Sequence, residues 1–170
     1  MAITIIGIGS YVPDKILTNF DLEKMVKTND QWIRTRTGIA ERRIAAPDQQ
    51  VSDLGLEAAL KALKMGNTAP EELDAIILSS TSAEYTFPAT ACALQYKLGN
   101  TKAFCFDVQA ACTGFIFSME TARSFMIANP KLKRVLLVAA EKISSMIDWT
   151  DRDTCVLFGD AASALLLSND

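Results

Sequence analysis

Residues 103–127 read AFCFDVQAACTGFIFSMETARSFMI, and they contain a predicted strand, a tight turn and a predicted helix. Apolar and aromatic residues fill the strand at 103–108, and small residues form the turn at 109–111. A helix is predicted at 113–127 because apolar residues cover most of its circumference, so it should be largely buried. A strand that leads through a short turn into a helix is typical of an α/β fold.

The rest of the sequence continues this alternation of strands and helices. Further strands are predicted at 3–8, 41–46, 73–81, 134–140, 154–158 and 161–167, and further helices at 21–26, at 31–35, at 88–98 and between the cap Ser52 and Gly66. The aliphatic runs predict that the middle strands, buried on both faces, are 3–8, 75–80, 103–107 and 135–140. No long helix separates the last two strands, so an antiparallel member is expected at the end of the sheet. We predict one five-stranded mixed sheet with helices on both faces.

The composition is that of one ordinary globular domain. The 170 residues are 49% hydrophobic, with 17 basic and 20 acidic side chains and a net charge of -3. This balance gives no reason to expect nucleic acid or a membrane surface as a partner. The longest apolar runs are too short to span a bilayer, and the N-terminus lacks the basic region of a signal peptide. We therefore expect a cytoplasmic protein.

The chain contains four cysteines and no histidine. Cys92, Cys105, Cys112 and Cys155 are spaced irregularly, which fits neither a zinc site nor a disulfide framework, so free thiols and no metal are expected. The lack of histidine excludes a Cys-His pair or a His-based metal site built from this chain alone. Cys92, in a predicted helix, and Cys105 and Cys155, in predicted strands, are typical of core residues.

Cys112 differs from the other cysteines because it lies at the turn between a strand and a helix. The first N–H groups of a helix have no intrahelical partner, and the positive end of the helix dipole favours a thiolate. The neighbours Ala110, Ala111 and Gly114 are small and leave room for a substrate, and N–H groups at the turn could face an oxyanion. These features predict a nucleophile. The alternative is a buried cysteine that acts as a small apolar side chain.

Several segments along essentially the whole chain resemble, in order, those of β-ketoacyl-acyl carrier protein synthase III enzymes. They are IGIGSYVP at 6–13, WIRTRTGIAER at 32–42, AACTGF at 110–115, TDR at 150–152 and FGD at 158–160. Several long motifs in order are a far more specific signal than one short pattern. The resemblance implies a thiolase-like fold of two similar βαβαβαββ halves, with residues 1–170 as the N-terminal half and the C-terminal half absent from this chain. The sequence departs from the family at Asp160-Ala161-Ala162-Ser163, where the family is richer in glycine.

The same resemblance implies an acyltransferase that starts fatty-acid biosynthesis. Cys112 would take a short acyl group from acyl-CoA, and the acyl group would then condense with malonyl-acyl carrier protein, with loss of CO2. Coenzyme A thioester would be a substrate, no cofactor would be bound permanently, and the enzyme would be a homodimer. The family takes a histidine and an asparagine for the decarboxylation from its second half, so this chain alone is expected to be inactive in condensation.

The resemblance also assigns residues to the binding of coenzyme A and of the acyl group. Trp32 and Arg152 would sandwich the adenine, and the same entrance would be lined by Thr28, Arg36 and Thr37. Phe87 would lie near the acyl pocket of the other subunit. The structural alternatives are a partly buried helix anchor for Trp32, salt bridges to nearby acids for Arg36 and Arg152, and a core aromatic for Phe87.

Two other functions remain open. One is a different thiolase-fold condensing enzyme, such as a hydroxymethylglutaryl-CoA synthase or a polyketide starter synthase, and the segment 32–42 argues against it. The other is a non-catalytic half-domain that binds a partner, which the length of the chain favours. In either case, a lone half should leave apolar surface uncovered, which predicts dimerisation, a partner chain or poor solubility.

Overall fold

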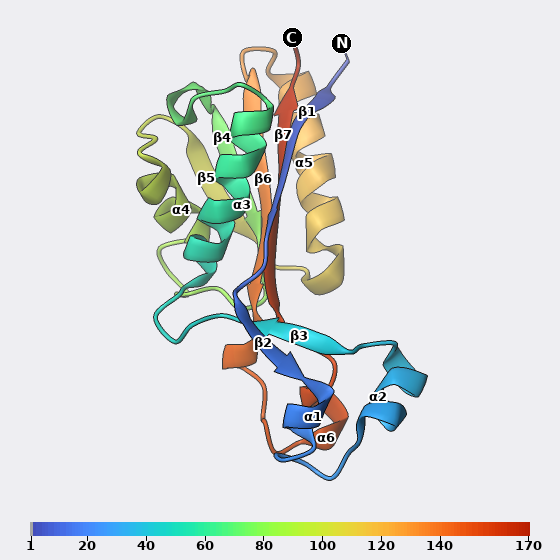
Figure 1. Cartoon of the computed structure of the whole chain (residues 1–170). Helices are drawn as coiled ribbons and strands as arrows, with labels where there is room; N and C mark the ends of the chain where they lie inside the picture. The colour runs from blue at the N-terminus through green and yellow to red at the C-terminus, as the bar shows by residue number, and fades with distance from the viewer. Residues whose placement is uncertain (1) are drawn as a thin grey trace.

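The computed structural model describes residues 2–170 and contains a five-stranded mixed sheet with helices on both faces (Figure 1). The strands lie in the order β1-β7-β6-β4-β5. β6, β4 and β5 are parallel, whereas β7 is antiparallel to both of its neighbours, β6 and β1. The bounds of the strands are β1 Thr4–Tyr11, β4 Ala75–Ser79, β5 Phe104–Val108, β6 Arg134–Lys142 and β7 Asp160–Ser168.

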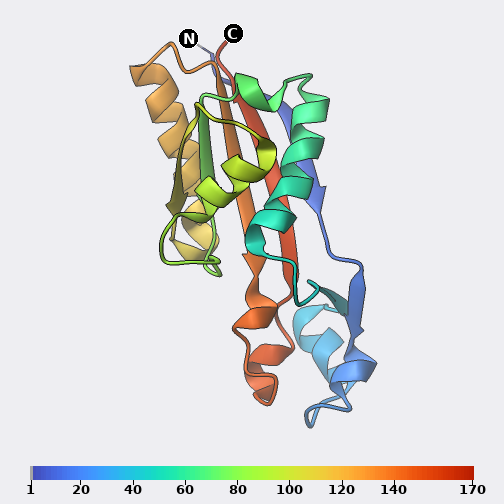
Figure 2. The same ribbon diagram turned by 90° about the vertical axis from the view of Figure 1, so that its left-hand side faces the viewer.

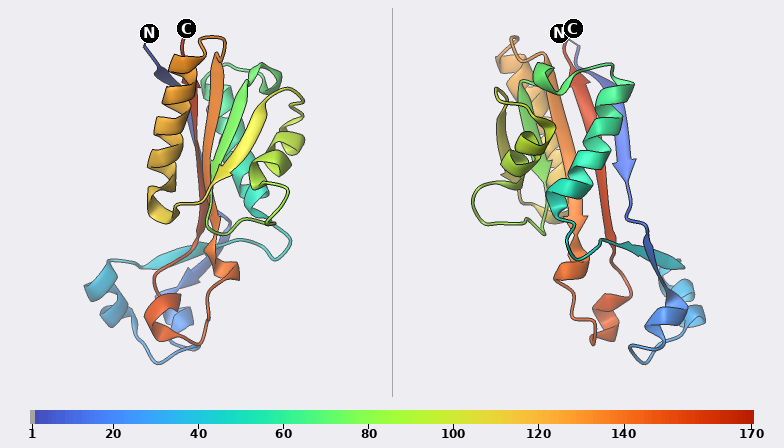
Figure 3. Two further views of the ribbon diagram at one scale, coloured as in Figure 1. Left: turned by 180° about the vertical axis from the view of Figure 1, so that it is seen from behind. Right: turned by 60° about the vertical axis from the view of Figure 1, so that its left-hand side comes forward.

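Three long helices connect these strands and give the chain the order β1-α3-β4-α4-β5-α5-β6-β7. The helices are α3 Val51–Met65, α4 Thr90–Leu98 and α5 Gly114–Ala128. α3 and α4 cover one face of the sheet and α5 covers the other (Figures 2 and 3). Because successive strand residues point to opposite faces, Leu136 packs with the α3 side and Leu137 with the α5 side. The expected βαβαβαββ unit and five-stranded mixed sheet are therefore confirmed.

The predicted set of middle strands is partly wrong. β1 and β5 are the two edges of the sheet, and Ile5 and Ile8 on β1 are 51% and 54% exposed. The middle strands are β4, β6 and β7, and all five residues of β4 are buried. β7 inserts between β1 and β6, so the antiparallel strand lies inside the sheet and not at its end. A run of β-branched residues signals a strand but does not say which strands pair with it.

Two local predictions are also wrong. Residues 154–158 do not form a strand, because the helix α6 Arg152–Cys155 starts at the cap Asp151, whose carboxylate accepts from the Asp153 N–H at 2.9 Å. Ser52 does not cap α3: the helix has already begun at Val51, and the Ser52 hydroxyl accepts from Lys97 Nζ at 2.6 Å. The predicted segment at 41–46 contains β3 Glu41–Ile44, whose antiparallel partner β2 Lys15–Thr18 had no clear signal in the sequence.

A small lobe lies at one end of the sheet, away from the two termini (Figure 1). It contains β2, β3 and the helices α1 Asn19–Leu22, α2 Asp30–Thr37 and α6. The buried residues of its core come from the three helices and the end of α6: Leu22, Ile33, Cys155 and Val156. Arg42 is buried among them and donates to the carbonyl oxygens of Leu17 and Val156, both at 3.2 Å, so it ties the first strand of the lobe to its last helix.

The outer face of α5 is uncovered and exposes several large apolar side chains beside the ion pair of Glu120 and Arg123. Ile116 is 57% exposed, and Phe117, Phe125 and Ile127 are exposed as well. The helix therefore buries only the stripe that contacts the sheet, which contains Ser118, Ala122 and Met126. The expectation of uncovered apolar surface on this chain by itself is confirmed.

Within residues 2–170, no helix combines the length and the apolar character that a bilayer-spanning helix needs.

Candidate active site

Cys112 is exposed at the turn between β5 and α5. β5 ends at Val108, residues Ala111–Thr113 form a single 3-10 turn, and α5 begins at Gly114. Ala111 has φ +46°, in the left-handed region that residues other than glycine rarely occupy. The Thr113 hydroxyl closes the turn by donating to the carbonyl oxygen of Ala110 at 2.7 Å. Cys112 itself is exposed in this chain, which is not the environment of a buried cysteine that acts as a small apolar side chain.

Gly114 allows the first residue of α5 to contact the sheet directly. A Cβ atom at this position would collide with the Ser79 hydroxyl at the end of β4, and it would lie 3.5 Å from the Ser79 Cβ and 3.6 Å from the Val108 carbonyl oxygen. The hydroxyl is thus the one severe clash, whereas the other two distances are ordinary contacts. The position of Cys112 relative to β4 depends on this close approach.

Gly114→Ala is expected to destabilise the protein by about 1–3 kcal/mol, the usual cost of overpacking, and to slow alkylation of Cys112 because the start of α5 must shift. Ser79→Ala removes the clashing hydroxyl, so the Gly114→Ala/Ser79→Ala double variant should recover most of both losses. Urea denaturation and the rate of iodoacetamide labelling at Cys112 measure the two effects. Additive effects of the two substitutions would show that the two side chains do not meet as described.

Cys112 lies in the wall of a cavity of about 530 Å3, here called the Cys112 cavity. Its lining comes from the carboxyl ends of β4 and β6, from the turn before α5 and from the segment before β7, and comprises Ser79, Thr81, Ala111, Cys112, Phe115, Ala139, Glu141, Ile143, Phe158 and Gly159. Carboxyl ends of parallel strands are where α/β sheets usually bind ligands. The mostly apolar lining suits an acyl chain better than a charged group.

Glu141 is a residue of this cavity that the sequence analysis did not identify. Its carboxylate accepts from the Thr81 N–H at 2.7 Å, the Ser82 N–H at 3.1 Å and the Ser82 hydroxyl at 2.6 Å. The carboxylate thereby holds the loop after β4 against the end of β6. The signal in the sequence was an acidic residue at the end of an apolar strand, which alone does not reveal what the acid binds.

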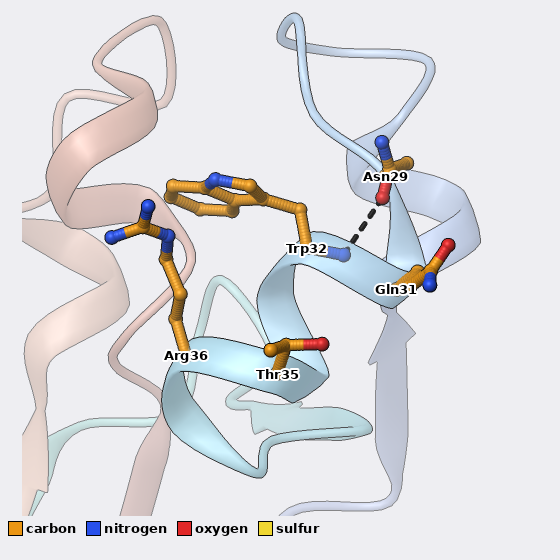
Figure 4. Close-up of a pocket in the computed structure, with 5 residues that line it drawn as sticks. All are labelled: Asn29, Gln31, Trp32, Thr35 and Arg36. Atoms are coloured by element: carbon orange, nitrogen blue, oxygen red, sulfur yellow. Dashed lines mark hydrogen bonds between the residues drawn. The ribbon is translucent and has the colours of Figure 1, made fainter.

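A second hollow, of about 340 Å3, lies on α2 in the small lobe (Figure 4). It is lined by Asn29, Gln31, Trp32, Thr35 and Arg36. The Asn29 side chain caps the helix by accepting from the Trp32 N–H at 2.7 Å. The Trp32 ring contacts two guanidinium groups, with Arg36 Cζ at 5.1 Å and Arg152 Cζ at 4.0 Å from the ring centroid.

The structure therefore brings Trp32, Arg36 and Arg152 together from two separate segments. Within residues 2–170, neither arginine lies within ion-pair distance of a carboxylate, so the salt-bridge alternative is wrong. The Arg152 guanidinium rests directly on the Trp32 ring. For a base to stack between them, the guanidinium and the ring must be about 7 Å apart, which is two stacking distances. Arg152 must swing away from the ring before a base can enter.

The other residues assigned by the resemblance have different environments. The Thr28 hydroxyl oxygen is buried and has no hydrogen-bond partner among residues 2–170. The Thr37 hydroxyl is already used, since it donates to the Ile33 carbonyl at 2.8 Å and accepts from the Ile39 N–H at 3.0 Å. Phe87 is 88% exposed in the loop between β4 and α4, so the alternative of a core aromatic is wrong.

The remaining cysteines are less accessible than Cys112. Cys155 is fully buried in α6, not in a strand, and burial and the nearby Asp151 raise the pKa of its thiol. Cys92 and Cys105 are half-buried on α4 and β5. Among residues 2–170, no group of three or more His, Cys, Asp or Glu side chains is placed to hold a metal ion.

Comparison with known proteins identifies similar sequences along the chain. Residues 106–170 match the family model of 3-oxoacyl-[acyl-carrier-protein (ACP)] synthase III. The β-ketoacyl-[acyl-carrier-protein] synthase III of Desulfitobacterium hafniense is 53% identical over 167 residues, which are 98% of this chain and 50% of that protein. The chain thus spans about half the length of the curated relatives that it matches.

Solved structures agree with the sequence matches. The 3-oxoacyl-[acyl-carrier-protein] synthase III of Aquifex aeolicus superposes with a TM-score of 0.95 at 48% identity, over 99% of this chain and 54% of that chain. A priming β-ketosynthase of a polyketide biosynthetic pathway superposes with a TM-score of 0.94 at 33% identity, over 99% of this chain and 50% of that chain. By sequence and by fold, the chain belongs to the β-ketoacyl-acyl carrier protein synthase III family, of which it corresponds to the N-terminal half.

Proposed function

We propose that Cys112 accepts a short acyl group from an acyl-CoA in the first step of fatty-acid biosynthesis. The observation that carries this proposal is an exposed thiol at the start of a helix, in the wall of a mostly apolar cavity. The thiolate attacks the thioester carbonyl, the coenzyme A thiolate leaves, and an acyl-cysteine remains. A donor at the turn would stabilise the oxyanion that forms during this attack. The N–H groups of Thr113 and Gly114 are not that donor, because they already bond to the carbonyl oxygens of Ala110 and Ala111.

The second step is condensation of the acyl group with malonyl-acyl carrier protein. Decarboxylation of malonate generates an enolate, whose charge needs donors in the site. This chain contains no histidine, and Glu141 in the Cys112 cavity is an acceptor that already receives several hydrogen bonds. Residues 1–170 are in this proposal the N-terminal half of the enzyme, and the C-terminal half supplies the histidine and asparagine for this step.

The hollow at Trp32 is in this proposal the binding site for the adenine of coenzyme A. An indole and a guanidinium are flat groups that stack on a base, and both Arg36 and Arg152 also carry the positive charge that coenzyme A phosphates attract. The Thr28 hydroxyl is buried as well as unpartnered, so in this proposal it contacts the ligand only if the loop before α2 opens, whereas Thr37 contributes by ending α2. The exposure of Phe87 on its loop supports a role near the acyl pocket of a second subunit, in a proposed homodimer.

Trp32→Ala is expected to raise the KM for acyl-CoA by roughly 10- to 100-fold in the intact enzyme, because base stacking contributes about 1–3 kcal/mol per base. kcat should change little, since the ring does not touch the reacting carbonyl. Steady-state kinetics with varied acyl-CoA measures both constants. Trp32→Phe should retain part of the affinity. An unaltered KM for Trp32→Ala would contradict base stacking at this site.

The uncovered face of α5 supports association with further protein, either the C-terminal half or another subunit. Side chains such as Phe117 and Ile116 are more than half exposed, and apolar surface of this kind usually lies in an interface. The same surface is what a non-catalytic half-domain would use to bind a partner. The two functions differ in whether Cys112 becomes acylated.

Mass spectrometry after incubation of the intact protein with acetyl-CoA tests the proposed function. The expected result is the mass of one acetyl group on the peptide that carries Cys112, and its loss when malonyl-acyl carrier protein is added. No acetyl-cysteine at any acetyl-CoA concentration would favour the non-catalytic half-domain. Acetyl-cysteine that does not react with malonyl-acyl carrier protein would point to a different condensing enzyme of the same fold.

A further inference from the structure

Cys92 and Cys105 form a pair of thiols that the proposed function does not use. Cys92 lies in the first turn of α4, and Cys105 is the second residue of β5, on the sheet face that α4 covers. Their sulfur atoms are 3.2 Å apart, and the Cys105 thiol donates to the Cys92 sulfur. The two cysteines lie on different elements, thirteen residues apart in the chain, so the packing of α4 on β5 is what brings their sulfur atoms together.

A neighbouring glutamine fixes the direction of the Cys105 thiol. Gln95 Nε2 donates to the Ala103 carbonyl oxygen at 2.5 Å, which turns its Oε1 toward Cys105 at 3.2 Å. The Cys105 proton is therefore shared between this amide oxygen and the Cys92 sulfur. Burial raises the pKa of Cys105 to about 12, and the hydrogen bond to Cys92 and the negative charges of Cys92 and Asp107 act in the same direction.

Both side chains are only partly buried, unlike that of Cys155. A disulfide requires a sulfur separation of about 2.05 Å, so the two sulfurs, now 3.2 Å apart, must close by roughly 1 Å. Among residues 2–170, Cys112 has no neighbouring sulfur with which to form such a bond.

We propose that Cys92 and Cys105 are a thiol oxidation site, at which a peroxide converts the pair into a disulfide between α4 and β5. The Cys92 thiolate attacks one oxygen of the peroxide, the O–O bond breaks, and a sulfenic acid and hydroxide form. The Cys105 sulfur then displaces the hydroxyl group from Cys92, which leaves with the Cys105 proton as water. The hydroxide of the first step takes up the proton that Cys92 lost when it ionised, so two thiols are oxidised and one peroxide molecule is reduced to two molecules of water.

Cys105 reacts after Cys92 in this proposal. A thiol reacts with peroxide as its thiolate, and the raised pKa of Cys105 keeps its thiol protonated. The cross-link would join the first turn of α4 to the strand that leads into the Cys112 turn. The site does not depend on the proposed acyl transfer, since neither sulfur lines the Cys112 cavity.

Peptide mapping of the intact protein after treatment with hydrogen peroxide tests the site. Free thiols are blocked with iodoacetamide, and trypsin then cleaves at Lys97 and Lys102, so only a disulfide keeps the Cys92 and Cys105 peptides together. A Cys112→Ser background removes the exposed competing thiol. We expect the joined peptides, their release by dithiothreitol, and the loss of iodoacetamide labelling at both cysteines.

Cys92→Ser and, separately, Cys105→Ala should each abolish the joined peptides. If one of these variants does not fold, the other still tests the proposal. Full iodoacetamide labelling of both cysteines after peroxide would overturn the proposal. So would a disulfide that joins either of them to Cys155 or to another molecule in place of each other.

Discussion

Cys112→Ala is expected to abolish acyl transfer from acetyl-CoA to the protein while the fold remains intact. The proposed acyl-enzyme bond is to the Cys112 sulfur, so removal of the thiol removes that bond. The side chain is exposed and, within residues 2–170, forms no hydrogen bond that stabilises the fold, so the free energy of unfolding should change by less than about 0.5 kcal/mol. Mass spectrometry of the acetyl group and urea denaturation give the two readouts.

Alkylation supplies an independent control for this assignment. In the folded wild-type protein, Cys112 should react with iodoacetamide faster than Cys92, Cys105 or Cys155, because it is the exposed cysteine of the four and lies at a helix start. Faster labelling of any other cysteine, or residual acetylation of Cys112→Ala, would show that the nucleophile is elsewhere.

Gly9→Val is expected to destabilise the protein by more than about 3 kcal/mol, a large fraction of the stability of a typical domain. A Cβ at Gly9 would collide with the Ala58 carbonyl oxygen and lie 2.7 Å from the Ala62 backbone nitrogen. Both clashing atoms belong to the backbone of α3, which no side-chain rotation can move. α3 must therefore separate from β1 or the strand must leave the sheet.

Ser10→Val is the matched control for this variant. Ser10 is the next residue of the same strand, its side chain is exposed, and valine is favourable in strands, so the change should be within about 0.5 kcal/mol. Urea denaturation midpoints of the two variants measure the difference. Equal midpoints would contradict the close packing of α3 on β1.

Gly7 and Gly9 on β1 show how much of the fold could be predicted from the sequence. The β-branched run around Gly7 and Gly9 predicts a strand, and the Leu and Ala spacing that follows predicts the helix α3. The reason for two glycines in the strand becomes visible only when the helix is placed on it, since each residue lies against a backbone carbonyl of α3 more than forty residues away.

The candidate site shows the same division. The strand, turn and helix around Cys112 are local features, because residues within one turn of the chain decide them. Glu141 could not be assigned from the sequence, because the N–H groups that it binds, on Thr81 and Ser82, lie about sixty residues earlier in the chain. The pairing of Cys92 with Cys105 was missed because it depends on how α4 packs on β5. Each of these cysteines was expected to be an isolated core residue.

What the sequence by itself determined is the alternation of strands and helices, the α/β class, the family and the position of Cys112 at the start of a helix. Local periodicity and short segments carry this information. Only the tertiary structure decided that β1 and β5 are the edges, that β7 pairs between β1 and β6, and that Arg152 rests on Trp32. Strand order and side-chain contacts depend on which segments pair or pack with each other. The free energy of this pairing and packing comes from residues far apart in the chain.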